Sequence, residues 1–113
     1  MEVSNYGWNE EKAKLNEEKH GVTFKEAIEV FKAKSGVVYF GEDQTEDYPE
    51  VRYTAAGFTE NYRFLFVVYE EFEEDFTDEP FTRIIHAKTF QKAHLKHFRN
   101  PDDKRDIKTF IQP

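Results

Sequence analysis

The hydrophobic residues of this chain change their spacing once, near residues 34–36, and this change constrains the fold more than any other feature. Before it, apolar positions recur every three or four residues, as they do on a helix with one buried face. After it, apolar and polar positions alternate in short runs, as they do along strands. Helices followed by a run of strands predict an α+β domain, with its helices against one face of an antiparallel sheet.

Two helices are expected in the first third of the chain. The first spans residues 10–20, because Asn9 suits the N-cap position and Gly21 suits the position just past the end. The second begins where Thr23 and Glu26 have the spacing of a capping box, and the apolar residues that follow fall at helical spacing.

Four strands and a last helix are expected after the second helix. The strands are 37–40, 51–57, 62–69 and 81–88, and the acidic residues 70–79 are expected to form an extended hairpin loop between the last two. The third is apolar on both faces and is therefore expected at the centre of the sheet. The last helix spans 89–100 and ends before Pro101. One core is expected to hold the large side chains Phe24, Phe31, Phe64, Phe66 and Ile84.

The length and composition predict one domain over residues 1–113, with 101–113 as a C-terminal extension. Ile107, Phe110 and Ile111 give this extension an apolar patch, which is expected to pack on the last helix or in an oligomer interface.

The chain has no cysteine, which excludes disulfides and Cys-based zinc sites. No apolar run has the length of a membrane span and no secretion signal is visible, so a cytoplasmic protein is expected.

The charge is unevenly distributed along the chain, whose formal net charge is -7. From Arg83 onward there are eight Lys and Arg against three Asp and Glu, whereas the preceding part has eight against twenty. Such a basic end can attract an anionic ligand to an otherwise acidic protein. An ordinary solvated, lysine-rich helix explains the same pattern.

A candidate reaction centre follows from the period of residues 81–88. Strand alternation predicts that Thr82, Ile84, His86 and Lys88 share one face, which Arg52 approaches from a neighbouring strand. A histidine beside cations suits acid–base chemistry in which negative charge develops on the substrate. Histidine titrates near neutral pH and can serve as acid or base. Alternatively, His86 is a hydrogen-bonded residue at a strand end and Arg52 an exposed strand residue.

Two other groups of polar residues have both a structural and a functional interpretation. His94 and His97 lie at i, i+3 on the last expected helix, but no carboxylate has a matching spacing, so neither a metal nor another cofactor is expected. Lys19 and His20 suit the carbonyl end of the first helix. They also belong to a longer pattern that leaves a role in a binding site open.

That pattern resembles the N-terminal signature of the BrnT family of ribonuclease toxins, which are related in fold to RelE-type toxins. The matching residues are Trp8, Asn9, Lys12, Asn16, Lys19, His20, Gly21, Val22, Phe24, Glu26, Ala27 and Phe31. The resemblance continues through "RYTAAG" and "RIIHAKTF" and covers roughly residues 6–99. The departures from the family pattern are Asn9 for Asp, His86 for Ser, Lys88 for Arg, Thr89 for Lys, His94 for Glu and Phe98 for Tyr.

The resemblance implies a ribonuclease toxin of a type II toxin–antitoxin pair, with cellular RNA as substrate and a BrnA-like antitoxin as partner. On this hypothesis the catalytic residues are Arg52, His86 and Lys88, and the RNA-binding residues are Lys19, His20, Arg83 and Lys92. The alternative is a BrnT-like domain that has lost cleavage and acts as a protein-binding module, such as an inhibitor of a nuclease. Self-association of the chain is left open by both hypotheses.

Overall fold

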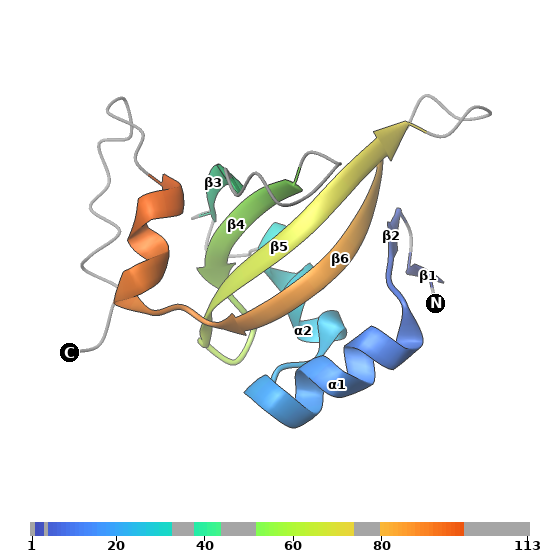
Figure 1. Cartoon of the computed structure of the whole chain (residues 1–113), viewed down its shortest axis with the longest axis horizontal. Coiled ribbons are helices and arrows are strands. Elements are labelled where there is room, and N and C mark those ends of the chain that lie inside the picture. The colour runs from blue at the N-terminus through green and yellow to red at the C-terminus, as the bar shows by residue number, and fades with distance from the viewer. Residues whose placement is uncertain (1, 4, 33–37, 44–51, 74–79, 99–113) are drawn as a thin grey trace.

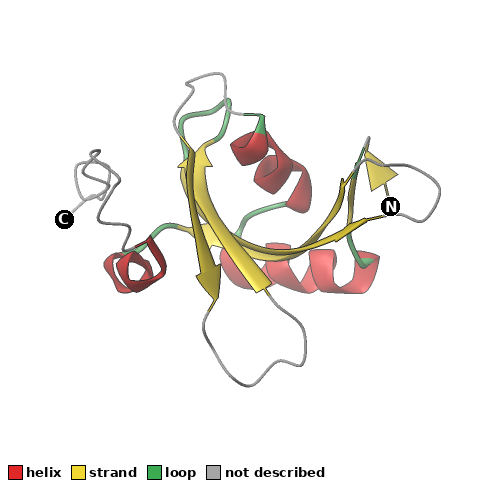
Figure 2. Cartoon of the chain, turned by 90° about the horizontal axis from the view of Figure 1, so that it is seen from above, coloured by secondary structure: helices red, strands yellow, loops and turns green. Residues whose placement is uncertain are grey.

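The computed structural model describes residues 2–3, 5–32, 38–43, 52–73 and 80–98. These residues form one mixed sheet of six strands, with two α-helices on one face and a short 3-10 helix toward the other (Figures 1 and 2). None of the helices in these ranges has the length and apolar character that a membrane span requires. The expected C-terminal extension, with its apolar patch, lies outside the described residues.

Helix α1 (Glu10–His20) begins and ends where its capping residues predict. The side chain of Asn9 accepts hydrogen bonds from the backbone N–H groups of Glu11 and Lys12, at 3.0 and 3.1 Å. Gly21 ends the helix in the left-handed conformation, with φ 65°, which glycine adopts without a steric penalty. The predicted bounds of the first helix are confirmed.

Helix α2 (Phe24–Phe31) carries the predicted capping box, in which Thr23 and Glu26 bond to each other's backbone N–H. Glu26 has a second partner, because Arg63 Nη1 lies 2.8 Å from its Oε2. Arg63 Nη2 also donates to the carbonyl of Gly21, at 3.1 Å. One arginine therefore joins the end of α1, the start of α2 and the nearby hairpin turn of the sheet.

The six strands lie in the order β1-β2-β6-β5-β4-β3. Their bounds are β1 (Glu2–Val3), β2 (Tyr6–Gly7), β3 (Val38–Asp43), β4 (Arg52–Phe58), β5 (Phe64–Glu73) and β6 (Pro80–Thr89). Strand β5 lies between β6 and β4, and its residues from Phe64 to Glu70 are all buried. The prediction of a central strand with two buried faces is confirmed.

The prediction of four antiparallel strands is wrong in number and partly in direction. Strands β1 and β2 are additional, and β2 pairs in parallel with β6, where Tyr6 lies opposite Thr82. Two-residue strands are too short to show a period in the sequence. Strand β5 also continues to Glu73, into a stretch expected to be an acidic loop over 70–79, of which residues 74–79 lie outside the described part.

The last helix is also shorter and tighter than the α-helix expected over 89–100. Strand β6 continues through Thr89, and the helix that follows, η1 (Lys92–Phe98), is a 3-10 helix. The backbone N–H of His94 donates to the carbonyl of Gln91 at 2.9 Å, which is the i to i+3 bond of this helix type. The strand pairing of residue 89 takes precedence over the helical pattern read from the sequence.

The buried apolar side chains form two cores, one on each face of the sheet, rather than the single core expected. The helix-side core is Trp8, Val22, Phe24, Ala27, Ile28, Val30, Ala55, Leu65, Val67, Tyr69, Ile84 and Ala87. The second core is Ala56, Phe64, Phe66, Val68, Phe90 and Phe98. Phe64 and Phe66 alternate with Leu65 and Val67 on β5, so the strand sends them to opposite faces. Phe31 is only partly buried against the helix-side core.

Tyrosine side chains at the edge of the helix-side core predict a loss of stability at alkaline pH. Burial raises the pKa of the Tyr69 phenol above its ordinary value of 10.0, and the negative charge of Glu71 raises it further. The neutral phenol is therefore favoured in the folded state. Its contribution to the free energy of unfolding is fully present below pH 10 and is lost as the pH rises above 10. The free energy of unfolding should fall by at most about 1.4 kcal/mol per pH unit because of this group.

Urea denaturation between pH 9 and pH 11 measures this loss in the wild type and in Tyr69→Phe. Because lysines also titrate in this range, the difference in slope between the two proteins isolates the phenol. Equal slopes in both proteins would contradict the assignment.

Candidate active site

A bulge in β6 determines which of its side chains reach the far face of the sheet, the face that carries the second core. Val68 pairs with His86 and Tyr69 pairs with Ile84, so Ile85 is an extra residue on β6. Ile84 therefore faces the helix-side core, whereas His86 pairs with a second-core residue. The prediction that Ile84 shares a face with His86 is wrong. By strand alternation Thr82 lies on the face of Ile84, so the prediction that Thr82 shares a face with His86 is wrong as well.

His86 and Lys88 lie on the same face, as the sequence predicts. Lys88 pairs with Phe66 of the second core, two residues along the strand from the pair of His86 and Val68. The imidazole of His86 lies 6.2 Å from the ring of Phe66, measured between centroids. Both polar side chains are half-buried. Both side chains therefore lie over the second core and remain partly accessible to solvent.

A row of three charged residues crosses the far face next to His86. Glu70 pairs with Arg83 of β6, and on the other side its Oε1 lies 3.9 Å from Nε of Arg52 on β4. The side chain of Arg52 is 17% exposed and that of Glu70 is 6% exposed, whereas Arg83 is exposed. Arg52 is thus on the face of His86 and Lys88, as expected, but it does not come from a neighbouring strand, because β5 lies between β4 and β6. The row carries two positive charges against one negative charge.

Glu70 is the member of this site that sequence reasoning missed. The sequence assigned it to an acidic loop, where a carboxylate has no special partner. The signal that was available is the alternation of β5, because Phe66 and Val68 predict that a strand continuing past Tyr69 places residue 70 on the same face. Glu70 is buried, with 5% of the residue exposed.

The predicted RNA-binding residues are divided between the two faces of the sheet. Arg83 belongs to the charged row, and Lys92 is exposed at the start of η1. Lys19 and His20 are exposed in the last turn of α1, which packs on the opposite face. Their position suits the carbonyl end of the helix, and a role in RNA binding stays a prediction.

The histidine of η1 is part of the second core. The ring of His94 stacks on Phe66 at 4.1 Å between centroids, and its Nδ1 accepts a hydrogen bond from the backbone N–H of Gln91 at 2.9 Å. The side chain of His97 lies outside the described residues. Within the described ranges, the side chains form no group of three or more His, Cys, Asp or Glu that could hold a metal ion.

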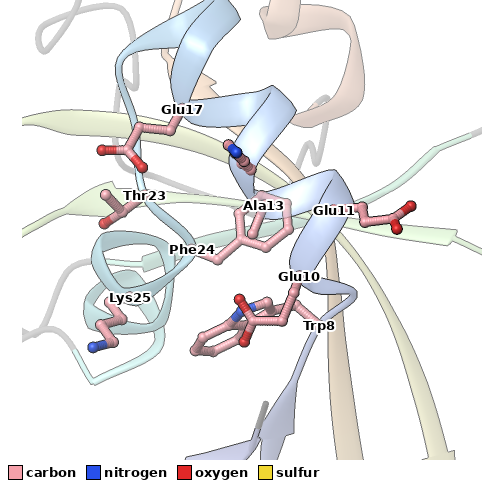
Figure 3. Close-up of a pocket in the computed structure, with 9 residues that line it drawn as sticks. Trp8, Glu10, Glu11, Ala13, Glu17, Thr23, Phe24 and Lys25 are labelled. Carbon is pink, nitrogen blue, oxygen red and sulfur yellow. The ribbon is translucent and has the colours of Figure 1, made fainter.

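A groove of about 590 Å³ separates α1 from α2 on the helix face, away from the charged row. Figure 3 shows Trp8 and Phe24 between the two helices, with the carboxylates of Glu10, Glu11 and Glu17 around them. The lining also includes Lys14 and Lys25, but three carboxylates outnumber these two cations, so the groove does not favour a phosphate backbone. The far face, with Arg52, His86 and Lys88, is therefore the better candidate for a reaction on an anionic polymer.

Comparison with known proteins identifies a family. The family model described as "Ribonuclease toxin, BrnT, of type II toxin-antitoxin system" matches residues 8–94. This match includes both α-helices and the part of β6 that carries His86 and Lys88. No curated protein matches the chain.

Proposed function

The chain belongs to the BrnT family of ribonuclease toxins of type II toxin–antitoxin systems, and we propose that it cleaves RNA on the far face of its sheet. The observation that carries this proposal is the register of β6 on β5, in which His86 pairs with Val68 and Lys88 with Phe66, so that both lie on the face that Arg52 shares. One titratable imidazole thus lies between cations from two strands, which is the minimum that metal-free RNA cleavage requires.

The proposed reaction is an attack of the ribose 2′-oxygen on the adjacent phosphate. A base accepts the proton of the 2′-hydroxyl and an acid protonates the departing 5′-oxygen, leaving a 2′,3′-cyclic phosphate. We assign one of these proton transfers to His86, because imidazole exchanges a proton near neutral pH, and the other to a solvent water. Arg52 and Lys88 stabilise the negative charge that develops on the phosphorane.

The remaining cations are assigned to substrate binding. Arg83 pairs with Glu70 in the charged row and Lys92 lies at the start of η1, and both are exposed, so both are available to phosphates of the substrate. Since a type II toxin is restrained by an antitoxin, we propose a BrnA-like protein as the partner and the cytoplasm as the site of action.

Cleavage of mixed RNA by the purified, partner-free protein tests this function directly. We expect cleavage to persist in a chelator, and to leave 2′,3′-cyclic or 3′-phosphate ends, because the assigned groups are side chains. Raising the salt concentration should weaken substrate binding, since phosphate contacts release counterions.

Message-engaged ribosomes serve as a second substrate, for the case in which free RNA is not cleaved. A folded protein that cleaves neither substrate would support the alternative, a non-catalytic protein-binding module. That alternative draws on the departures from the family pattern at His86 and Lys88.

A further inference from the structure

The most unusual group on the far face is the carboxylate of Glu70, which is buried beside two arginines. A buried carboxylate is costly unless cations or hydrogen-bond donors compensate for its lost hydration. Here Arg52 lies on one side, 3.9 Å from Nε to Oε1, and Arg83 is the paired residue on the other side. The three residues come from three adjacent strands, so the sheet itself fixes their order.

We propose that Glu70 is a positioning residue that holds the guanidinium of Arg52 in the orientation required by the scissile phosphate. The proposal rests on the proposed function of the far face. The contact is an ion pair and not a hydrogen bond, since Nε lies 3.9 Å from Oε1. The buried negative charge of Glu70 favours those rotamers of Arg52 that keep the guanidinium close to it.

The burial of Glu70 favours positioning over direct proton transfer. A base that accepts the 2′-hydroxyl proton must lie within hydrogen-bond reach of that hydroxyl. Glu70 is 5% exposed, whereas Arg52 and His86 are half-buried and can meet a bound substrate. Glu70 therefore acts through the arginine, and His86 is closer to the reacting atoms.

An arginine held in advance is worth more to catalysis than a mobile one. A free arginine side chain populates many rotamers, and fixing it during the reaction adds an entropic cost to the activation free energy. In a preorganised site the side chain is already fixed in the folded state, so the reaction does not carry that cost. A misplacement of about 1 Å can lower a rate by roughly 100-fold. Neutralising Glu70 should therefore lower kcat more than it changes KM.

Kinetic measurements on Glu70→Gln test the proposal, with Glu71→Gln as the matched control. Glu71 is the next residue but is exposed, and by alternation it lies on the opposite face, where it pairs with Thr82. We expect Glu70→Gln to lower kcat by roughly 10–100-fold, with KM changed by less than about threefold, and Glu71→Gln to leave both constants unchanged.

A double-mutant cycle with Arg52→Lys separates positioning from a general loss of structure. Lysine keeps the charge but lacks the planar group that Glu70 orients. Adding Glu70→Gln to Arg52→Lys should therefore lower kcat by less than about twofold further, since the two residues act as one unit. Fully additive losses, or an unchanged kcat in Glu70→Gln, would overturn the proposal.

If Glu70→Gln does not fold, Glu70→Asp replaces it, because this variant keeps the charge and withdraws it by one methylene. We expect Glu70→Asp to lower kcat by roughly 3–10-fold at unchanged denaturation midpoint. A wild-type kcat in folded Glu70→Asp, in which the contact with Arg52 is lengthened, would count against positioning.

A measurement without RNA distinguishes failure of this inference from failure of the proposed function. Nε of Arg52 is buried, so its N–H resonance should exchange slowly with solvent in the wild type, and at least about tenfold faster where Glu70→Gln or Glu70→Asp releases the side chain from its position. Equal exchange rates would overturn the positioning of Arg52 even if RNA is cleaved. Slow exchange in a protein that cleaves no RNA would uphold the contact and reject the ribonuclease function.

Discussion

Replacing His86 with alanine is expected to lower the rate of RNA cleavage by roughly 10²–10⁴-fold, the usual effect of losing a general acid or base. His86 pairs with Val68 of the second core and therefore lies on the face of Arg52 and Lys88. Single-turnover cleavage of a defined oligonucleotide, followed over a range of pH, measures the effect. The variant should also lose the part of the pH profile that His86 contributes.

Two controls make this result specific to the site. Lys12→Ala removes an exposed cation from α1, on the other face of the molecule, and should leave the rate unchanged. Lys88→Ala should slow cleavage while the denaturation midpoint stays within the range of other surface substitutions. Cleavage that proceeds at the wild-type rate in folded His86→Ala would refute the assignment and favour the binding-module hypothesis.

The helices could be predicted because their ends are determined by local chemistry. Asn9, Gly21 and the pair of Thr23 and Glu26 bond to backbone groups within three or four residues, so sequence spacing alone specifies them. The central strand could be predicted for a related reason, since an apolar run on both faces requires burial on both faces. The two-residue strands β1 and β2 depend on a distant pairing with β6 and leave no such pattern.

The candidate site was predicted only in part, because the face on which a strand residue lies depends on the strand register as well as on the alternation of the sequence. Alternation correctly put His86 and Lys88 together, but the extra residue at Ile85 changed the phase of the strand for everything before it. The same limit divided the expected core, since Phe64 and Phe66 face η1 instead of the α-helices. Glu70 was missed because the length of β5 was underestimated.

The N-terminal family signature turns out to contain a structural link to the proposed site. Asn16, in the middle of α1, is buried with 5% of the residue exposed. Its Oδ1 accepts from the backbone N–H of Ala87 at 3.0 Å, and its Nδ2 donates to the carbonyl of Ala87 at 2.8 Å. Nδ2 also donates to the carbonyl of Val22 at 2.9 Å. The amide thus pairs with β6 as a neighbouring strand would, at the residue between His86 and Lys88.

Asn16→Leu is therefore expected to destabilise the protein by about 2–5 kcal/mol, because it leaves two or three buried backbone groups without their hydrogen bonds. Denaturant unfolding measures the loss, with two other asparagines for comparison. Asn9→Ala removes an N-cap and should cost about 1 kcal/mol. Asn61→Ala changes an exposed residue and should stay within about 0.5 kcal/mol of the wild type.

The same variant also shows whether the link between α1 and β6 supports the reaction. At a temperature where Asn16→Leu is still folded, the segment of β6 around Ala87 has lost its partner on one edge, and the side chains on either side of it should be held less firmly. We therefore expect the cleavage rate to fall by more than the unfolded fraction of the protein accounts for. Stability equal to that of Asn61→Ala would show that water or the backbone replaces the amide, and that the signature asparagine is dispensable for the fold.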